Sequence, residues 1–439
     1  MTTILAFLFV LGVLIFVHEL GHFLAARRLG IRVLTFSLGF GPKILKFQRG
    51  DTEYCVSIVP LGGYVKMAGE NPDDPRSGNP DEFLSRTKWE RFQVLIMGPV
   101  MNLALAVVVM AFVLAQGAEV PVFQDQPPVV GMVQPGSPAE KVGIMRGDRI
   151  LAVDNDEVDT WDDLYLQVGT RPNRDVPVRL SRDGQTMSVT VRTGARGKYE
   201  VGSIGVLPDV SPLIKVVNQG EAADKAGLKP NDVIVALNGE RMVFKENLGD
   251  AIAKNADKEI DLLVKRGDEE RHIRVVPAKV GSKGMIGVTL GDETKVFKPG
   301  PMEAVKLSVQ RNWESSGLIF RTLGGLFTGE TSVRQLQGPV GIAQLSGEAA
   351  RTDFLSVLSL MAVLSLNLGL INLMPVPVLD GGHITIMALE GIARRDFSMQ
   401  AKEKMLLAGF VVLMMLMVTV IYNDLTRISW LERLMPWRN

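Results

Sequence analysis

The chain has 439 residues, which gives room for about two to four domains of roughly 100 to 200 residues each. Its 48 Lys and Arg balance its 48 Asp and Glu, so no global basic field exists that would favour nucleic-acid binding. A mean hydropathy of +0.18 with 22% charged residues is too apolar for an ordinary soluble domain and too charged for a protein that lies wholly in lipid. The composition therefore indicates both membrane and aqueous parts, and the single cysteine, Cys55, excludes an internal disulfide.

Four long apolar runs each approach the ~20 residues that a helix needs to cross hydrocarbon. They cover residues 3–26, 94–116, 354–374 and 405–422. The first run lacks the preceding basic region of a signal peptide, because its arginines follow the apolar stretch. The sequence therefore predicts four transmembrane helices, the first of them uncleaved.

Basic residues predict the orientation of these helices. Lysines and arginines cluster in the segments that join the first span to the second and the third to the fourth: Arg27, Arg28, Arg32, Lys43, Lys46, Arg49, Lys66, Arg394, Arg395, Lys402 and Lys404. By the positive-inside rule both segments face the cytoplasm. Residues 118–353 then lie on the other side of the membrane, which in a bacterium would be the periplasm or the cell exterior.

The large external segment contains a repeat. Residues 131–155 align without a gap on residues 215–239, with matching glycines and with Asp148 opposite Asp232. Each copy has the pattern of a strand, a glycine turn, a short helix and a second strand. The sequence therefore predicts a duplicated, β-rich module.

The repeat resembles the PDZ domain. Two triplets resemble the carboxylate-binding loop of that domain, Ile204-Gly205-Val206 and Ile286-Gly287-Val288. Because each triplet closes its repeat, the modules resemble the circularly permuted bacterial form, at residues 127–208 and 212–290. PDZ domains bind peptides by adding a strand to a sheet edge. The sequence leaves open whether this pair binds a peptide or serves only as a spacer and lid.

The first apolar run contains the pattern H-E-x-x-H at His18-Glu19-Leu20-Gly21-His22. Two imidazoles one helical turn apart on one face, with Glu19 beside them, suit one zinc ion. The alternative is a pair of interfacial histidines that cap the span. It is disfavoured because these polar groups are costly in an apolar helix unless they face a cavity and have partners. At ~1.5 Å per residue, His18 lies roughly 20 Å from Ile4, toward the cytoplasmic face.

A catalytic zinc needs a third protein ligand and leaves a fourth position for water. The end of the third span returns to the same depth, and there Pro375 and Pro377 interrupt the helix. Broken backbone at membrane depth is tolerated only where it lines a protein or water cavity. Asp380 and His383 are the two candidates, and spacing alone leaves the choice between them open.

These features together resemble the site-2 intramembrane zinc metalloproteases, of the regulator-of-sigma-E protease type with tandem PDZ domains. The resemblance rests on H-E-x-x-H in the first span, on Leu379-Asp380-Gly381 after a Pro-x-Pro break, and on two modules between the second and third of four spans. It covers nearly the whole chain. It implies a polytopic α-helical membrane protein of four transmembrane helices, with two inserted β-rich PDZ domains and a membrane-associated β-hairpin.

The resemblance also implies a role for each polar residue of the motifs. His18, His22 and Asp380 become the ligands of one Zn²⁺ per chain, and Glu19 becomes the general base. His383 is then not a ligand.

Two asparagines in the third span match family asparagines near the cleft, Asn367 and Asn372, and the resemblance implicates Asn372 in holding unwound substrate. Ordinary interhelical hydrogen bonding is the alternative. In the second span, Gly98-Pro99-Val100-Met101-Asn102 resembles the family's G-P-x-x-N, with a packing kink as the alternative.

Two further segments carry predictions. Residues 42–59 have the pattern of a hairpin, Lys43–Gln48 with Glu53–Val59, which resembles the family's membrane-associated β element. Its edge could pair with an unfolded stretch of substrate, and a plain cytoplasmic hairpin is the alternative. Residues 302–327 repeat apolar side chains at helical spacing, which predicts an external amphipathic helix on the membrane surface or on the PDZ pair.

The predicted segments, in chain order, are the first transmembrane helix, the loop with the hairpin, the second transmembrane helix, the two PDZ domains, the amphipathic helix, and the last two transmembrane helices. Their bounds are residues 1–30, 31–91, 92–117, 127–208, 212–290, 301–328, 354–383 and 403–423.

The resemblance implies a protease that cleaves the transmembrane segments of single-span membrane proteins. Its implied substrates are anti-sigma factors already trimmed by a site-1 protease, and signal-peptide remnants. Its implied location is the lipid bilayer of the bacterial cytoplasmic (inner) membrane, as a multi-pass protein with periplasmic or extracellular PDZ domains and without nucleic acid. A non-catalytic scaffold that presents the two modules would leave Glu19 without a purpose. A metal transporter would require an inverted pair of broken spans, which the sequence lacks.

Overall fold

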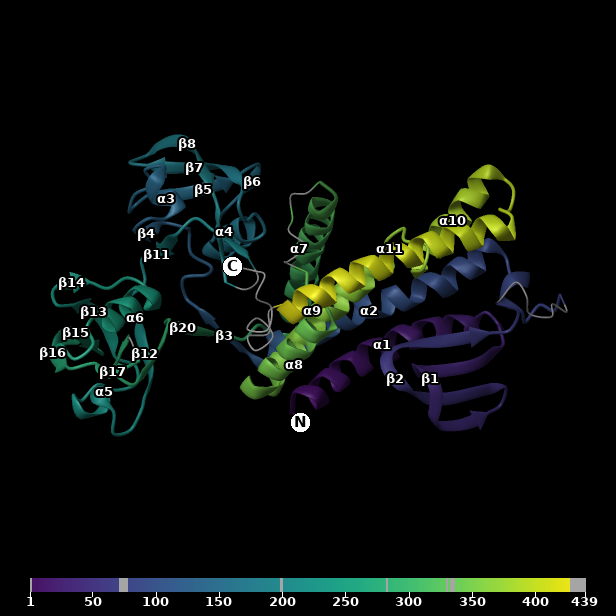
Figure 1. The fold of residues 1–439 in the computed structure, drawn as a ribbon, viewed down its shortest axis with the longest axis horizontal. Coiled ribbons are helices and arrows are strands. Elements are labelled where there is room, and N and C mark those ends of the chain that lie inside the picture. Colours follow the sequence, from purple (N-terminus) through teal and green to yellow (C-terminus); the bar gives the residue numbers. More distant parts are fainter. Residues whose placement is uncertain are drawn as a thin grey trace. The chain divides into compact units, whose positions relative to one another are not determined.

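The structure is a computed structural model that describes residues 2–70, 78–197, 200–281, 283–328, 331 and 336–426 (Figure 1). The chain forms two compact units. The first comprises Met1–Gly117 and Lys298–Asn439, and the second comprises Ala118–Phe297.

The described part of the first unit contains seven helices of eight or more residues and a sheet formed by one hairpin. Four of them are long and apolar enough to cross a membrane: α1 (Thr2–Arg28), α2 (Lys88–Gln116), α9 (Phe354–Asn372) and α11 (Met399–Thr426). The other three are α7 (Pro301–Thr328), α8 (Pro339–Thr352) and α10 (Asp380–Ala393). The prediction of four long apolar helices is confirmed.

Helix α2 is the centre of this unit, because it packs against α1, α7 and α9. It begins in a capping box, in which the Thr87 side chain accepts from the Glu90 N–H and the Glu90 carboxylate accepts from the Thr87 N–H. Pro99 lies inside the helix and cannot donate to the carbonyl four residues earlier. The α2 backbone is therefore weakened where it passes the candidate site.

The hairpin strands β1 (Val33–Arg49) and β2 (Thr52–Met67) are longer than the predicted segments. Residues 35–38 of β1 pair with residues 53–56 and also with residues 63–66 of β2, so the two bent strands make a sheet four segments wide. Residues 63–67 form one edge, since each has a single strand partner. The sheet packs on α1, where the ring of Phe23 meets the rings of Phe36 and Tyr54.

Helix α7 buries its small and polar face. Ala304, Ser308 and Asn312 are buried, and the Ser308 hydroxyl donates to the Val107 carbonyl of α2 at 2.7 Å. The apolar side chains of Val305, Val309 and Trp313, which predicted the amphipathic helix, are exposed in the protein alone. Contact of this face with lipid stays a prediction.

The second unit contains two modules with the same order of elements. The first has β4 (Val130–Val133), α3 (Pro138–Lys141), β5 (Arg149–Val153), β6 (Asp156–Glu157), α4 (Trp161–Gly169), β7 (Asp175–Arg182), β8 (Gln185–Arg192), β9 (Gly194–Arg196), β10 (Val201–Ser203) and β11 (Val206–Pro208). The second has β12 (Leu213–Val217), α5 (Ala222–Lys225), β13 (Val233–Leu237), β14 (Glu240–Arg241), α6 (Lys245–Lys254), β15 (Ile260–Arg266), β16 (Glu269–Val275), β17 (Ala278–Val280), β18 (Lys283–Met285) and β19 (Val288–Gly291).

Each module has its own hydrophobic core. The two ends of the unit pair with each other as β3 (Ala118–Pro121) and β20 (Thr294–Phe297). The duplication seen in the sequence is therefore a duplication of whole folded modules.

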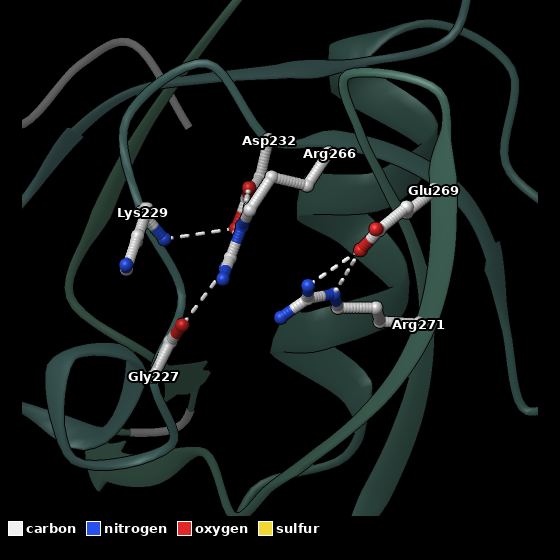
Figure 2. A network of polar contacts seen from close by, with 6 residues as sticks. All are labelled: Gly227, Lys229, Asp232, Arg266, Glu269 and Arg271. Carbon is white, nitrogen blue, oxygen red and sulfur yellow. Dashed lines mark hydrogen bonds and ion pairs between the residues drawn. The ribbon is translucent and has the colours of Figure 1, made fainter.

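The aspartates that the repeat alignment matched hold equivalent positions. In the second module the Asp232 carboxylate accepts from the Lys229 N–H at 2.8 Å and from two nitrogens of Arg266 at 2.7 Å (Figure 2). Arg266 donates further to the carbonyl of Gly227 at 2.9 Å.

The first module has the same arrangement, in which Asp148 accepts from the Met145 N–H and from Arg182, and Arg182 donates to the Gly143 carbonyl. Burial alone would raise the pKa of the Asp148 carboxyl, but the hydrogen bonds from Arg182 and Met145 hold this pKa below its ordinary value. Each pair thus fastens the turn after the short helix to a strand of the central sheet.

Asp148→Ala should destabilise the first module by about 3 kcal/mol, because it leaves the Arg182 guanidinium and a backbone N–H without their partner. Amide hydrogen exchange of β5 in the full chain measures the effect. The matched control is Asp175→Ala, whose exposed pair with Arg192 should contribute under about 1 kcal/mol.

The pH dependence has a definite sign. Because the folded pKa of Asp148 is depressed, its contribution is complete above about pH 5 and is lost as the pH falls through the folded pKa. Equal exchange rates in both variants would contradict this account.

Candidate metal centre

Helix α1 places the two histidines and the glutamate of H-E-x-x-H in one helical turn. The Nε2 atoms of His18 and His22 lie 3.2 Å apart, and the two rings meet edge to face. Glu19 and His22 are each only 8% exposed. This is the arrangement expected of an i, i+4 histidine pair, which puts two ring nitrogens on one side of a helix.

The third donor comes from the opposite end of the chain. Asp380 is the first residue of α10, and its Oδ2 lies 3.2 Å from His18 Nε2 and 3.5 Å from His22 Nε2. After α9 the chain turns back through residues 373–379, and the start of α10 packs tightly on this turn. A Cβ at Gly382 would lie 2.0 Å from the Val376 carbonyl oxygen. Glycine after Asp380 therefore allows the close turn that aims the carboxylate at the histidines.

The three donor atoms fit one tetrahedral zinc ion. Ligands held ~2.0–2.2 Å from zinc are about 3.3–3.6 Å from one another at the corners of a tetrahedron. The observed separations of 3.2, 3.2 and 3.5 Å match this spacing. Within the described ranges, this is the one group of three or more His, Cys, Asp or Glu side chains whose donor atoms all lie within 4.8 Å.

The outer nitrogen of His22 also fits a metal ligand. Its Nδ1 lies 2.8 Å from the Val94 carbonyl of α2. A carbonyl can only accept, so Nδ1 carries the proton and the lone pair of Nε2 faces Asp380. Such a hydrogen bond on the outer nitrogen is typical of metal-binding histidines, because it fixes the ring and its tautomer.

Helix α2 can lie this close to the histidines because it carries glycine there. A Cβ at Gly98 would lie 2.3 Å from His22 Nε2 and 2.9 Å from His18 Cε1. On α1, a Cβ at Gly21 would lie 2.3 Å from the Met97 carbonyl oxygen. Small residues at a helix crossing let two backbones approach within a membrane. The absence of a side chain at Gly98 therefore leaves the space that both imidazoles occupy.

The other predicted residues lie in several places. His383 lies one turn after Asp380 on α10, its side chain is exposed, and it is not in the donor group. Asn367 and Asn372 are half-buried on α9. The two predicted carboxylate-binding triplets end at the first residues of β11 and β19, Val206 and Val288. Their glycines, Gly205 and Gly287, lie in the left-handed region at φ 82° and 79°.

Glu19 has one neighbour, Gly63, that the sequence does not predict. Gly63 of β2 lies so close that a Cβ there would be 2.8 Å from Glu19 Cγ. The edge segment of the hairpin sheet thus runs directly beside the glutamate. No pattern in the sequence indicates this contact, because it depends on how the sheet packs on α1.

Comparison with known proteins agrees with this geometry. The model of Peptidase family M50 matches residues 6–416. The regulator of sigma-E protease RseP of Escherichia coli K12 is 32% identical, with 96% of this chain and 98% of that protein covered, and the regulator of sigma E protease of Salmonella typhi gives the same values. A relative from Neisseria meningitidis, named as a zinc metalloprotease, is 30% identical over 98% of this chain and 100% of its own length.

A solved PDZ domain of an SdrC-like protein from Listeria monocytogenes is 19% identical over 20% of this chain and 90% of that domain, with a TM-score of 0.17, which is too low to bear on the fold. The match to the family model, in contrast, spans most of the chain and therefore shows the family. The chain belongs to peptidase family M50 and is a metalloprotease.

Gly98→Ala should weaken binding of a divalent metal by about tenfold or more, because the added methyl group must displace the imidazoles from the metal. Metal content after dialysis, measured by mass spectrometry, reports the effect. Gly12→Ala on α1 is the matched control, since a Cβ at Gly12 meets nothing within 4 Å. Full metal content in the Gly98 variant would contradict this role for the glycine.

Proposed function

We propose that this protein is an intramembrane zinc metalloprotease that cleaves the transmembrane segments of single-span membrane proteins. The observation that carries the proposal is the convergence of His18, His22 and Asp380 beside Glu19 in a helix apolar enough to cross a membrane. These groups would be costly at that depth without a function that uses them. By the position counted from Ile4, the site would lie toward the cytoplasmic face of the inner membrane.

His18, His22 and Asp380 would hold the zinc ion, one per chain. When bound, zinc supplies Lewis acidity, which activates water and polarises a peptide carbonyl. Glu19 is adjacent to His18 on α1 and stays outside the donor group, so its carboxylate is available as the general base. It would take a proton from the attacking water and return it to the leaving amine.

A substrate helix must unwind before its peptide bonds reach Glu19, and its freed backbone groups then need new partners. In the part of the chain that the structure describes, residues 63–66 have a strand partner on one side only, and Gly63 lies beside Glu19. A peptide that adds to this edge would therefore run past the base.

The asparagines Asn367 and Asn372 would bind further backbone groups of the substrate. In the described part of the chain neither side-chain amide has a hydrogen-bond partner, so both can make new contacts. Asn372 is the last residue of α9, next to the turn that leads to Asp380.

The relatives named as regulators of sigma E suggest the substrate class. We infer that this chain cleaves an anti-sigma factor already trimmed by a site-1 protease, and also signal-peptide remnants. The two modules would be PDZ domains on the periplasmic or extracellular side. Residues that include Leu164, Val168, Ile204 and Gly205 line a pocket of only about 40 Å³ in the first module, which admits no more than a small side chain.

Glu19→Gln should abolish cleavage while leaving zinc bound, because the amide keeps the shape of the side chain but cannot take a proton. The measurement pairs zinc content with cleavage of a trimmed single-span substrate, with and without a chelator. A fall in rate of about 100-fold or more is expected. Normal zinc content together with cleavage at the wild-type rate would overturn the proposed mechanism.

Asp380→Ala should lose both zinc and activity, whereas His383→Ala should keep both. The two residues lie one turn apart on α10, so His383→Ala is a matched control for damage to that helix. The reverse result would reject the ligand assignment while leaving a protease with a different third ligand.

Deletion of residues 127–290 should permit cleavage of an untrimmed substrate, if the modules act as a filter against bulky external domains. Cleavage of the trimmed form should be unchanged, because the modules contribute no group to the donor set. If the modules instead recruit substrate through Ile204-Gly205-Val206 or Ile286-Gly287-Val288, the deletion should slow cleavage of the trimmed form. If a folded, zinc-loaded deletion variant still failed to cleave the untrimmed substrate, the modules would not act as a filter.

A further inference from the structure

The outer nitrogen of His18 has a partner on α2 to which no role has been assigned. Asn102 Nδ2 lies 3.2 Å from His18 Nδ1. The Asn102 side chain is fully buried, and within the described residues its contact with His18 is its only hydrogen bond, since Oδ1 has no partner. A buried amide with half of its capacity unused is costly, so its one contact calls for an explanation.

The orientation of this amide decides which nitrogen of His18 carries the proton. Asn oxygen and nitrogen have nearly the same shape, and a 180° turn of the amide exchanges them without moving other atoms. In either orientation one amide atom contacts His18 and the other has no partner, so burial does not choose between them. The two orientations differ in which nitrogen of the His18 ring must carry the proton. If Nδ2 donated to Nδ1, the proton of His18 would lie on Nε2, the atom that faces His22 and Asp380.

The neighbouring residues on α2 also favour an orientation in which Asn102 accepts a hydrogen bond from His18. Val94, Gly98 and Asn102 are spaced four residues apart, so they lie on one face of the helix. The Val94 carbonyl accepts from His22, Gly98 lies under both rings, and Asn102 contacts His18. Ser365 of α9 donates to the backbone carbonyl of Asn102 at 2.7 Å, which fixes this position.

We propose that Asn102 is a positioning residue whose Oδ1 accepts a hydrogen bond from Nδ1–H of His18 and so directs the Nε2 lone pair of His18 to the zinc ion. This inference rests on the proposed zinc site. It gives the two histidines equivalent partners, a backbone carbonyl for His22 and a side-chain carbonyl for His18, both on the same face of α2.

The test compares zinc affinity in three variants of the full chain, purified in detergent, by competition with a chelator. Asn102→Leu removes the acceptor and should weaken zinc binding by about 10- to 100-fold. Asn102→Asp keeps an acceptor of the same shape and cannot donate, so its affinity should equal or exceed that of the wild type. Asn312→Leu, which removes another buried helical asparagine away from the donor group, should have wild-type affinity.

Substitution of Co²⁺ for zinc adds a spectroscopic readout, because the visible absorption band should change in Asn102→Leu and be restored in Asn102→Asp. Wild-type affinity in Asn102→Leu would overturn the inference. So would equal weakening in both Asn102 variants, since the amide would then act through packing or as a donor. If Asn102→Leu fails to fold, Asn102→Asp decides alone: a tenfold loss contradicts the inference and a retained affinity supports it. A wild-type protein that binds no zinc would instead reject the proposed function.

Discussion

The close crossing of α1 and α2 is the constraint on which the proposed metal centre depends. The two histidines face α2, and only a glycine at position 98 leaves room for both rings. Once the helices meet at Gly21 and Gly98, the α2 backbone supplies the carbonyl that orients His22. The same contact thus brings the two proposed histidine ligands against α2 and orients His22. A larger residue at the crossing would disturb both, so packing and metal binding cannot be separated in this part of the protein.

The third proposed ligand, Asp380, depends on a different constraint, which is the interruption of the helix between α9 and α10. Helix α9 ends at Asn372, and the turn before α10 brings Asp380 back to the level of the histidines. A continuous helix would carry Asp380 about 12 Å further along its axis, at 1.5 Å per residue. Pro375 and Pro377 prevent that continuation, and Pro377 packs against Gly409 of α11.

Much of this site can be predicted from the sequence, because its strongest signals are local. Helical spacing alone puts His18 and His22 on one face, and apolar runs predict the helices. The choice of Asp380 over His383 came from family resemblance, since spacing left both open. Gly63 and the hydrogen bond of Asn102 could not be predicted, because each depends on contacts between segments distant in the sequence. The hairpin was predicted too short for a related reason, as residues 35–38 pair on both sides.

The far end of α10 shows how the position of Asp380 is secured. Ten residues after Asp380, the buried carboxylate of Glu390 accepts from Lys402 at 2.7 Å and from the Phe397 N–H at 2.9 Å. Lys88, the first residue of α2, lies 3.5 Å from the same carboxylate. Helix α10 is therefore fixed to α2 near its end, while Asp380 at its start faces histidines that α2 also orients. Because the charge of Glu390 is buried, it needs these partners, and both lysines and the Phe397 N–H supply them. Asp380, the third proposed ligand, thus lies at the start of a helix whose far end is tied to α2, the helix that contacts both histidines.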